Sequence, residues 1–204
     1  MVIAAENKTR KSTVRGKVTR QKLLESSIQL LASTGYAATT TQAIIDNAGV
    51  SRGSLLHQFG TRQEMILATA ESALMLMYEN VSSHLKAFED PIDSLMNFPN
   101  TIWTAQNKNA ARALVEIQLA SRWEKGLAQQ LRKINTRNTN MIVSELIEFA
   151  DGVNMSDVDG FISVVSVVID STQSMAIRLP TEEDQNRLKT KLDLIANFLS
   201  LIHI

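Results

Sequence analysis

The amino-acid sequence predicts an all-α fold. Its 204 residues include only three prolines and eight glycines, so few positions interrupt a helix. Apolar residues recur mainly three and four positions apart, which is the period of an amphipathic helix. The β-branched run at residues 161–169 is the best candidate strand, but its pattern continues to Leu179, beyond strand length, and no partner strand is apparent. We therefore expect helices throughout.

The first helix follows a polar stretch. Residues 1–17 are basic and aperiodic, and we interpret them as a flexible basic arm. From Thr19 onward, an apolar stripe through Leu24 and Leu31 indicates a helix. Gly35 is a suitable residue for ending it, because glycine readily adopts the left-handed conformation found after helix C termini.

Two short helices come next, over residues 40–48 and 52–59. The threonines at 39–41 and Ser51 are candidate N-caps for them. The link between them contains Gly49, which is expected to adopt a positive φ. Helices this short bury little apolar surface alone, so we expect them to pack on the first helix as a helix-turn-helix.

The rest of the chain also shows helical patterns. A fourth helix is expected to begin at Thr61, where Glu64 three residues later completes a capping box. Further helices are expected over residues 91–106, 108–121, 123–150 and 156–179, and a last one after Pro180. These segments give three parts: the arm at 1–17, a helix-turn-helix domain at 18–64 and a helical body at 65–204.

Charge is distributed unevenly although the net charge is zero. Residues 1–62 carry nine Lys and Arg against three Asp and Glu, a net charge of +6. The remainder carries 12 basic and 18 acidic residues, a net charge of −6. Such asymmetry suggests an N-terminal part that meets phosphate, joined to a body that does not.

Composition also excludes several classes of protein. Without cysteine the chain cannot form disulfides, thiolate metal sites or a cysteine nucleophile, and its three histidines are scattered, so we expect no metal and no cofactor. There is no nucleophile elbow, phosphate-binding glycine loop or HExxH motif, so a helical hydrolase using His57 or His84 has no support and no catalytic residue is proposed. No apolar leader and no membrane-length apolar window appear, so we expect a cytoplasmic protein without a membrane partner.

The segment TTTQAIIDNAGVSRGSLLHQFGTRQEM at residues 39–65 closely resembles the DNA-binding signature of the TetR family of bacterial regulators. The likeness extends over about residues 19–66. Two positions depart from the family pattern. Leu56 stands where a phosphate-contacting tyrosine is common, so one backbone contact is expected to be missing and Leu56 to pack; Gly60 stands where proline or lysine is common. The matching positions are Thr40, Ile44, the turn at 48–51, Gly53, Ser54, Leu55, His57, Phe59, Thr61 and Arg62.

The resemblance implies that double-stranded operator DNA is a partner. In a helix-turn-helix the second short helix enters the major groove, where an arginine such as Arg52 can bridge O6 and N7 of guanine. Residues at helix ends favour phosphate. The expected DNA-binding residues are Thr40, Thr41, Ser51, Arg52, Gly53, Ser54, His57, Gln58 and Arg62.

The resemblance further implies a homodimer, because one reading helix contacts only a few base pairs. The last two helices are the candidate interface, although an intramolecular core would explain much of their apolarity. The expected interface residues are Phe161, Val165, Val168, Thr172, Leu188, Leu192, Ile195 and Leu199.

A small apolar effector is the third implied partner, and its binding is expected to release a repressor from its operator. Methionine and aromatic residues form adaptable apolar cavities, although at helical spacing they are more often ordinary core. The candidate pocket residues are Met75, Met96, Phe98, Trp103, Leu119, Trp123 and Met141. A helical protein-interaction module with a basic tail remains the alternative to a DNA-binding regulator.

Overall fold

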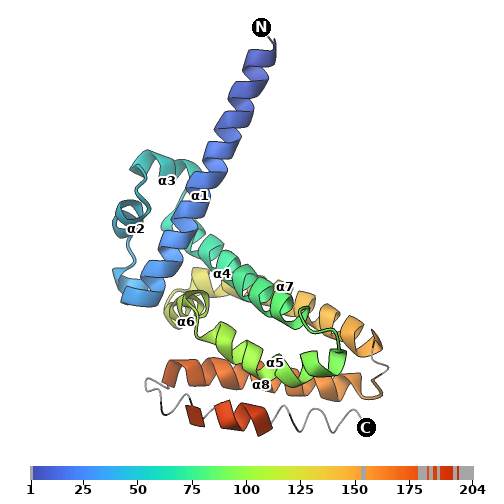
Figure 1. Ribbon diagram of the computed structural model, residues 1–204. Helices are drawn as coiled ribbons and strands as arrows, with labels where there is room; N and C mark the ends of the chain where they lie inside the picture. The colour runs from blue at the N-terminus through green and yellow to red at the C-terminus, as the bar shows by residue number, and fades with distance from the viewer. Residues whose placement is uncertain are drawn as a thin grey trace.

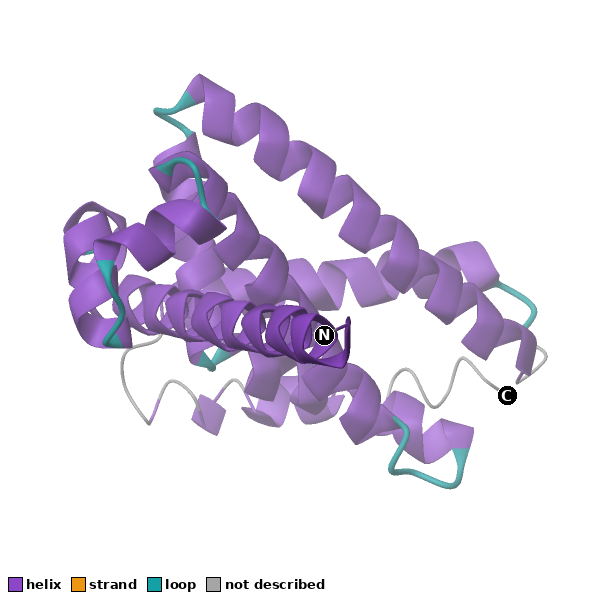
Figure 2. Ribbon diagram, turned by 90° about the horizontal axis from the view of Figure 1, so that it is seen from above, coloured by secondary structure: helices purple, strands orange, loops and turns teal. Residues whose placement is uncertain are grey.

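The computed structural model describes residues 2–152, 155–178, 183, 186, 187, 189–194 and 197. Every regular element in this part of the chain is an α-helix, which confirms the predicted all-α class (Figure 2). The helices follow the predicted order closely. They are α1 (Val2–Ala38), α2 (Thr41–Ala48), α3 (Arg52–Gln58), α4 (Arg62–Leu85), α5 (Pro91–Gln106), α6 (Asn109–Ser121), α7 (Lys125–Gly152) and α8 (Val158–Arg178).

Helix α1 differs from the prediction at its N-terminal end. It begins at Val2, where a flexible arm over residues 1–17 was expected, and its first half extends beyond the other elements (Figure 1). Gly16 is the only glycine or proline before Gly35. Once the packed half of α1 has formed, each added residue gains a backbone hydrogen bond without a new nucleation step, so the helix continues toward the N terminus.

The predicted helix boundaries in the N-terminal domain are confirmed by their caps. Gly35 interrupts α1 with a φ of 80°, and Gly49 ends α2 in the left-handed conformation with a φ of 62°. The Thr40 hydroxyl accepts a hydrogen bond from Ala43 N at 3.1 Å. The Ser51 hydroxyl accepts one from Ser54 N at 3.2 Å. These local bonds fix where the two short helices begin.

Helix α4 has the expected cap with one difference. Thr61 Oγ1 accepts from the backbone N–H of Glu64 at 3.1 Å, as a capping box requires. The Glu64 carboxylate, however, accepts from Gly60 N at 2.9 Å, one residue before the cap. The reciprocal bond therefore ties the end of the α3–α4 link to the first turn of α4.

Three buried clusters hold the fold together. The first joins α1, α2, α3 and the start of α4 through residues such as Leu23, Ile44, Leu55 and Phe59. The second joins α1 to α4, α6 and α7, and the third lies between α5, α7 and α8. The second cluster is the one that connects the N-terminal domain to the body, because the later part of α1 packs along α6.

Candidate DNA-binding surface

Helix α3 has one face in the core and one face in solvent. Leu55 and Phe59, one helical turn apart, are each 3% exposed and pack in the first cluster. Arg52, Leu56 and His57 are exposed. Because α3 is anchored by its buried residues and by the Ser51 cap, its outer side chains project from a rigid support.

The exposed side chains of α3 are available to bind a partner. Neither Arg52 nor His57 makes a hydrogen bond or ion pair with another described residue, although both are exposed donors. Gly53, which lies between Arg52 and His57 in the sequence, carries no side chain. A Cβ built there would have Ser51 Oγ, at 3.9 Å, as its nearest neighbour. This part of α3 is therefore unobstructed.

The predicted contacts at the helix ends are partly occupied by the fold. The hydroxyls of Thr40 and Ser51 accept the capping bonds, and Ser54 Oγ lies 2.9 Å from Ser51 Oγ. Gln58 is half-buried at the end of α3, and Thr41 is half-buried at the start of α2. The Thr40 hydroxyl and one hydroxyl of the Ser51–Ser54 pair can still donate a hydrogen bond outward, so the expected role of these residues as DNA contacts remains a prediction.

Arg62 lies in a structural network. Its guanidinium donates to Tyr36 Oη at 2.9 Å, to Tyr36 O at 3.1 Å and to Thr39 O at 3.3 Å. It also stacks 4.4 Å from the centre of the Tyr36 ring. These contacts tie the start of α4 to the end of α1, a role that the motif alone did not reveal; a phosphate contact by Arg62 would have to compete with them.

Tyr36 links the same network to the body. Its backbone N–H donates to Glu116 Oε2 of α6 at 3.0 Å, and its phenol donates to the Glu124 carboxylate at 3.1 Å. Burial raises the pKa of the Tyr36 phenol above its ordinary value of 10.0, so the phenol keeps its proton at neutral pH. It can therefore donate to Glu124 while it accepts from Arg62.

Replacing Arg62 by alanine is therefore expected to destabilise the fold. Losing charged hydrogen bonds at a half-buried site should lower the free energy of unfolding by about 1.5–3 kcal/mol. Arg137→Ala is the matched control, because Arg137 is 75% exposed and forms a surface ion pair with Glu71. That loss should cost less than about 1 kcal/mol. Urea unfolding measures both values. Equal losses in the free energy of unfolding would show that the Arg62 network stabilises the fold no more than a surface ion pair does.

Three basic residues of α1 that the sequence did not single out as DNA contacts lie beside α3. A Cβ built at Gly16 would be 3.5 Å from Gln58 Nε2, so α1 passes close to the end of α3 at this point. Arg15 and Lys17 flank Gly16 and are exposed, whereas Arg20 donates to Gln58 O at 3.4 Å and stacks on the Phe59 ring. The sequence signal for these residues is the clustering of Lys and Arg before residue 23. Because residues 1–17 were expected to form a flexible arm, Arg15 and Lys17 were not expected to lie beside α3.

The predicted effector residues do not converge on one pocket. Trp123 is 84% exposed, Met75 49% and Leu119 46%, so these three line no enclosed site, which corrects their assignment. Phe98 is buried in the third cluster, whereas Met96, Trp103 and Met141 are half-buried. The spacing of apolar residues showed that these helices are amphipathic, but not which large side chains would lie outside the core.

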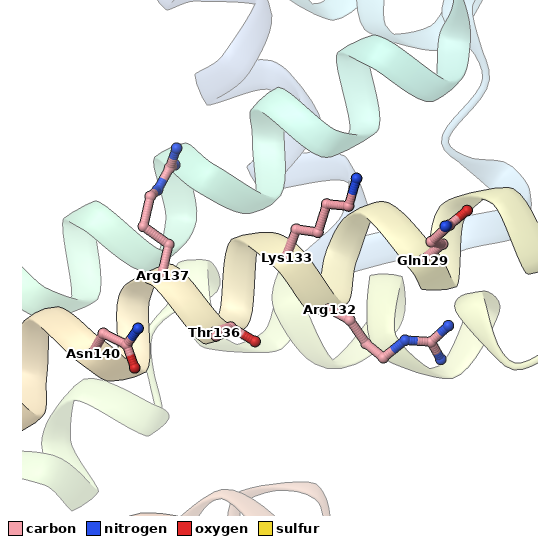
Figure 3. A pocket seen from close by; sticks show the side chains of 6 residues that line it. All are labelled: Gln129, Arg132, Lys133, Thr136, Arg137 and Asn140. Atoms are coloured by element: carbon pink, nitrogen blue, oxygen red, sulfur yellow. The ribbon is translucent and has the colours of Figure 1, made fainter.

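An open hollow of about 640 Å³ runs along α7, and none of the predicted effector residues lines it (Figure 3). The residues that line it are exposed and come from one face of that helix, and much of the surface that they present to the hollow is the apolar part of their side chains. The lining residues are Gln129, Arg132, Lys133, Thr136, Arg137 and Asn140.

The predicted interface residues of α8 face the interior of their own chain. Phe161, Val165, Val168 and Thr172 are all buried, the first three in the third cluster. They are core residues, which corrects their assignment to an exposed dimer surface. Helix α8 carries apolar residues on two stripes, and this stripe packs against α5 and α7. In the last segment Leu192 is also buried, while Leu188, Ile195 and Leu199 lie outside the described residues.

Within the described residues, no group of His, Asp and Glu side chains could hold a metal ion. The helices there are also too short or too polar to cross a membrane.

Comparison with known proteins agrees with this geometry. Residues 23–69 match the model of the bacterial regulatory proteins of the tetR family. The chain is 34% identical over 65 residues to the HTH-type transcriptional repressor AcnR of Corynebacterium efficiens, a match covering 32% of this chain and 35% of AcnR. It is 22% identical to the HTH-type transcriptional regulator CymR of Pseudomonas putida over 89% of each chain.

A solved structure shows that the likeness in fold extends into the body. The crystal structure of the multidrug binding protein EbrR complexed with imidazole has a TM-score of 0.61 and 16% identity, covering 88% of this chain and 93% of EbrR. Fold and surface together define a helix-turn-helix protein with a helical body. The N-terminal part of the chain, residues 23–69, is therefore similar to the tetR family of bacterial regulatory proteins, and the two relatives named above are transcriptional regulators.

Proposed function

We propose that this protein is a transcriptional repressor that binds operator DNA as a homodimer and leaves it when a small, largely apolar effector binds the body. The observation that carries the proposal is the outer face of α3. Arg52 and His57 are exposed on a short helix anchored in the core, and neither side chain makes a hydrogen bond or ion pair with another described residue. A surface of this form fits the major groove of DNA.

Contacts to phosphate are proposed to come from the edge of α1 and from helix ends. Arg15 and Lys17 are exposed beside the end of α3, within residues 1–62, where positive charge is concentrated. Such contacts position a protein on the duplex without reading its sequence. Thr40, Ser51 and Gln58 are proposed to add polar contacts around the same surface.

The proposed dimer contact on α8 is the face opposite to the buried stripe. Val167 is 64% exposed there, and Ser163, Ser166 and Ser171 lie exposed on the same side. Small side chains allow two helices to approach closely, and an exposed valine among them gains from burial. Sedimentation equilibrium should show a dimer at micromolar concentration, and Val167→Asp should shift it toward monomer; a stable wild-type monomer would contradict the proposal.

The proposed effector site lies in the body, between α5, α6 and α8. Thr101 is 6% exposed, and its hydroxyl has no hydrogen-bond partner among the described residues. A buried polar atom without a partner is costly, and a bound molecule could supply one. On two of these helices, Gln173 of α8 donates a hydrogen bond to Gln118 of α6 at 3.2 Å. The similar protein EbrR was solved with imidazole, which supports a small-molecule site in a body of this fold.

The test combines DNA binding with a reporter gene. The wild-type protein should retard DNA from its own upstream region in a gel-shift assay, and should lower expression of a reporter placed behind that DNA. Retardation of every duplex alike, or of none, would favour a protein-interaction module with a basic tail. A rise in reporter expression would show an activator.

The effector can be found by titrating small apolar compounds into the protein and into its DNA complex. Because coupling is reciprocal, a compound that weakens DNA binding must itself bind the DNA complex more weakly. A compound that fills the body with no change in operator affinity would contradict the release mechanism for that compound.

A further inference from the structure

Leu56 is an unexpected residue on the outer face of α3. Its side chain is 56% exposed, whereas packing was expected from the sequence. Within α2 and α3, where burial is described for every residue, Leu56 is the only large apolar side chain that is exposed; Ile44, Ile45 and Leu55 are buried. The fold therefore does not use Leu56 as core.

The position of Leu56 places it among the residues that face DNA. It lies one helical turn after Arg52 and next to His57, and all three side chains are exposed. Residues one turn apart have Cβ atoms about 5–6 Å apart, and successive bases of one strand are about 3.4 Å apart. If Arg52 contacts one base, Leu56 reaches a base one or two steps away.

The chemistry of leucine decides what it can recognise there. Leucine has no hydrogen-bond donor for a phosphate and none for a polar base edge. In the major groove the apolar group on a base edge is the C5 methyl of thymine, which other base pairs lack. The absence of a side chain at Gly53 leaves the neighbouring surface of α3 free to come close to the bases.

We propose that Leu56 reads a thymine by contact with its C5 methyl group, one or two base pairs from the base that Arg52 contacts. This inference rests on the proposed DNA-binding function and adds a specificity-determining residue to it. It predicts an operator whose half-site contains a guanine and, one or two positions away, a thymine whose methyl group contributes to affinity.

Deoxyuridine provides a direct test, because it differs from thymidine only by the missing methyl group. The operator is first obtained by selecting bound duplexes from a random-sequence library with the wild-type protein. Each thymine of the selected site is then replaced by deoxyuridine, and the affinity is measured by titration. Losing about one buried methyl group should weaken wild-type binding roughly fourfold per half-site, or about 16-fold when both half-sites are changed.

Leu56→Ala completes the cycle. This variant should bind the unmodified operator at least as weakly as the wild type binds the critical deoxyuridine operator, and it should be insensitive to that replacement. Ile147→Ala is the matched control, because Ile147 is a 43% exposed apolar residue on α7, far from α3 in the chain. It should retain the full deoxyuridine effect, and thermal unfolding should show both variants folded.

The possible results separate the two proposals. If the wild type selects no DNA sequence, the proposed function itself fails. If it selects an operator that lacks a thymine near the Arg52 base, or is indifferent to every deoxyuridine, the role of Leu56 is overturned while DNA binding stands. A deoxyuridine effect that persists in Leu56→Ala overturns it as well.

Discussion

Replacing Arg52 with alanine is expected to reduce operator affinity by about 1–3 kcal/mol for each half-site, and by about twice that for a symmetric operator. Arg52 is exposed at the start of α3 and makes no hydrogen bond or ion pair with another described residue. The thermal stability of the variant should therefore stay close to that of the wild type. Fluorescence titration of labelled operator measures the affinity.

Specificity is the more informative readout for the Arg52 variant. If Arg52 bridges a guanine, Arg52→Ala should lose discrimination at one position of each half-site and keep it at the others. Arg132→Ala is the matched control, since Arg132 is an exposed arginine on α7 and should leave affinity unchanged. Equal affinities for wild type and Arg52→Ala would remove α3 as the reading helix.

Ile117→Ala is expected to have the largest effect on stability. Ile117 is fully buried in the second cluster, between α6 and the helices α1, α4 and α7. Deleting three of its carbons leaves a cavity where the N-terminal domain meets the body, at a cost of about 2–5 kcal/mol. Urea unfolding should show a lower midpoint for this variant.

The control for the buried site is Ile147→Ala, the same substitution at a residue that is 43% exposed. It should change the free energy of unfolding by less than about 0.5 kcal/mol. If both variants unfold at the same urea concentration, Ile117 is not part of a tightly packed junction, and the account of how the two parts are joined would be wrong.

Features set by short-range interactions could be predicted from the sequence. The caps at Thr40, Ser51 and Thr61 each depend on a hydroxyl and a backbone N–H three residues later. The left-handed turn at Gly49 depends on one residue. For these elements a window of a few residues contains all the physical information, so both the helices and their boundaries were predicted correctly.

Long-range partners could not be predicted in the same way. Arg62 was assigned to DNA because of its place in the motif, but its guanidinium bonds to Tyr36, 26 residues earlier in the chain. Nothing in the local pattern distinguishes an arginine that faces phosphate from one that stacks on a distant ring. The choice depends on the packing of α4 against the end of α1.

Amphipathic patterns left the orientation of α8 undetermined. One apolar stripe of this helix contains Val165 and Val168, and the other contains Val164 and Val167. Either stripe could face the core, and only the packing against α5 and α7 shows that the first one is buried, whereas in the second Val164 is half-buried and Val167 is exposed. The large residues of the body posed the same problem, since Trp123 is apolar in the sequence but 84% exposed in the structure.

The central claim is that α3 reads a DNA sequence, and a comparison of specific with non-specific binding tests it most directly. The protein is titrated against its selected operator and against a scrambled duplex of equal length, over a range of salt concentrations. Operator binding should be at least about 10³-fold tighter at physiological salt, and both affinities should fall with salt as phosphate contacts are screened. Equal affinities for the two duplexes at every salt concentration would contradict the claim, because charge alone would then account for binding.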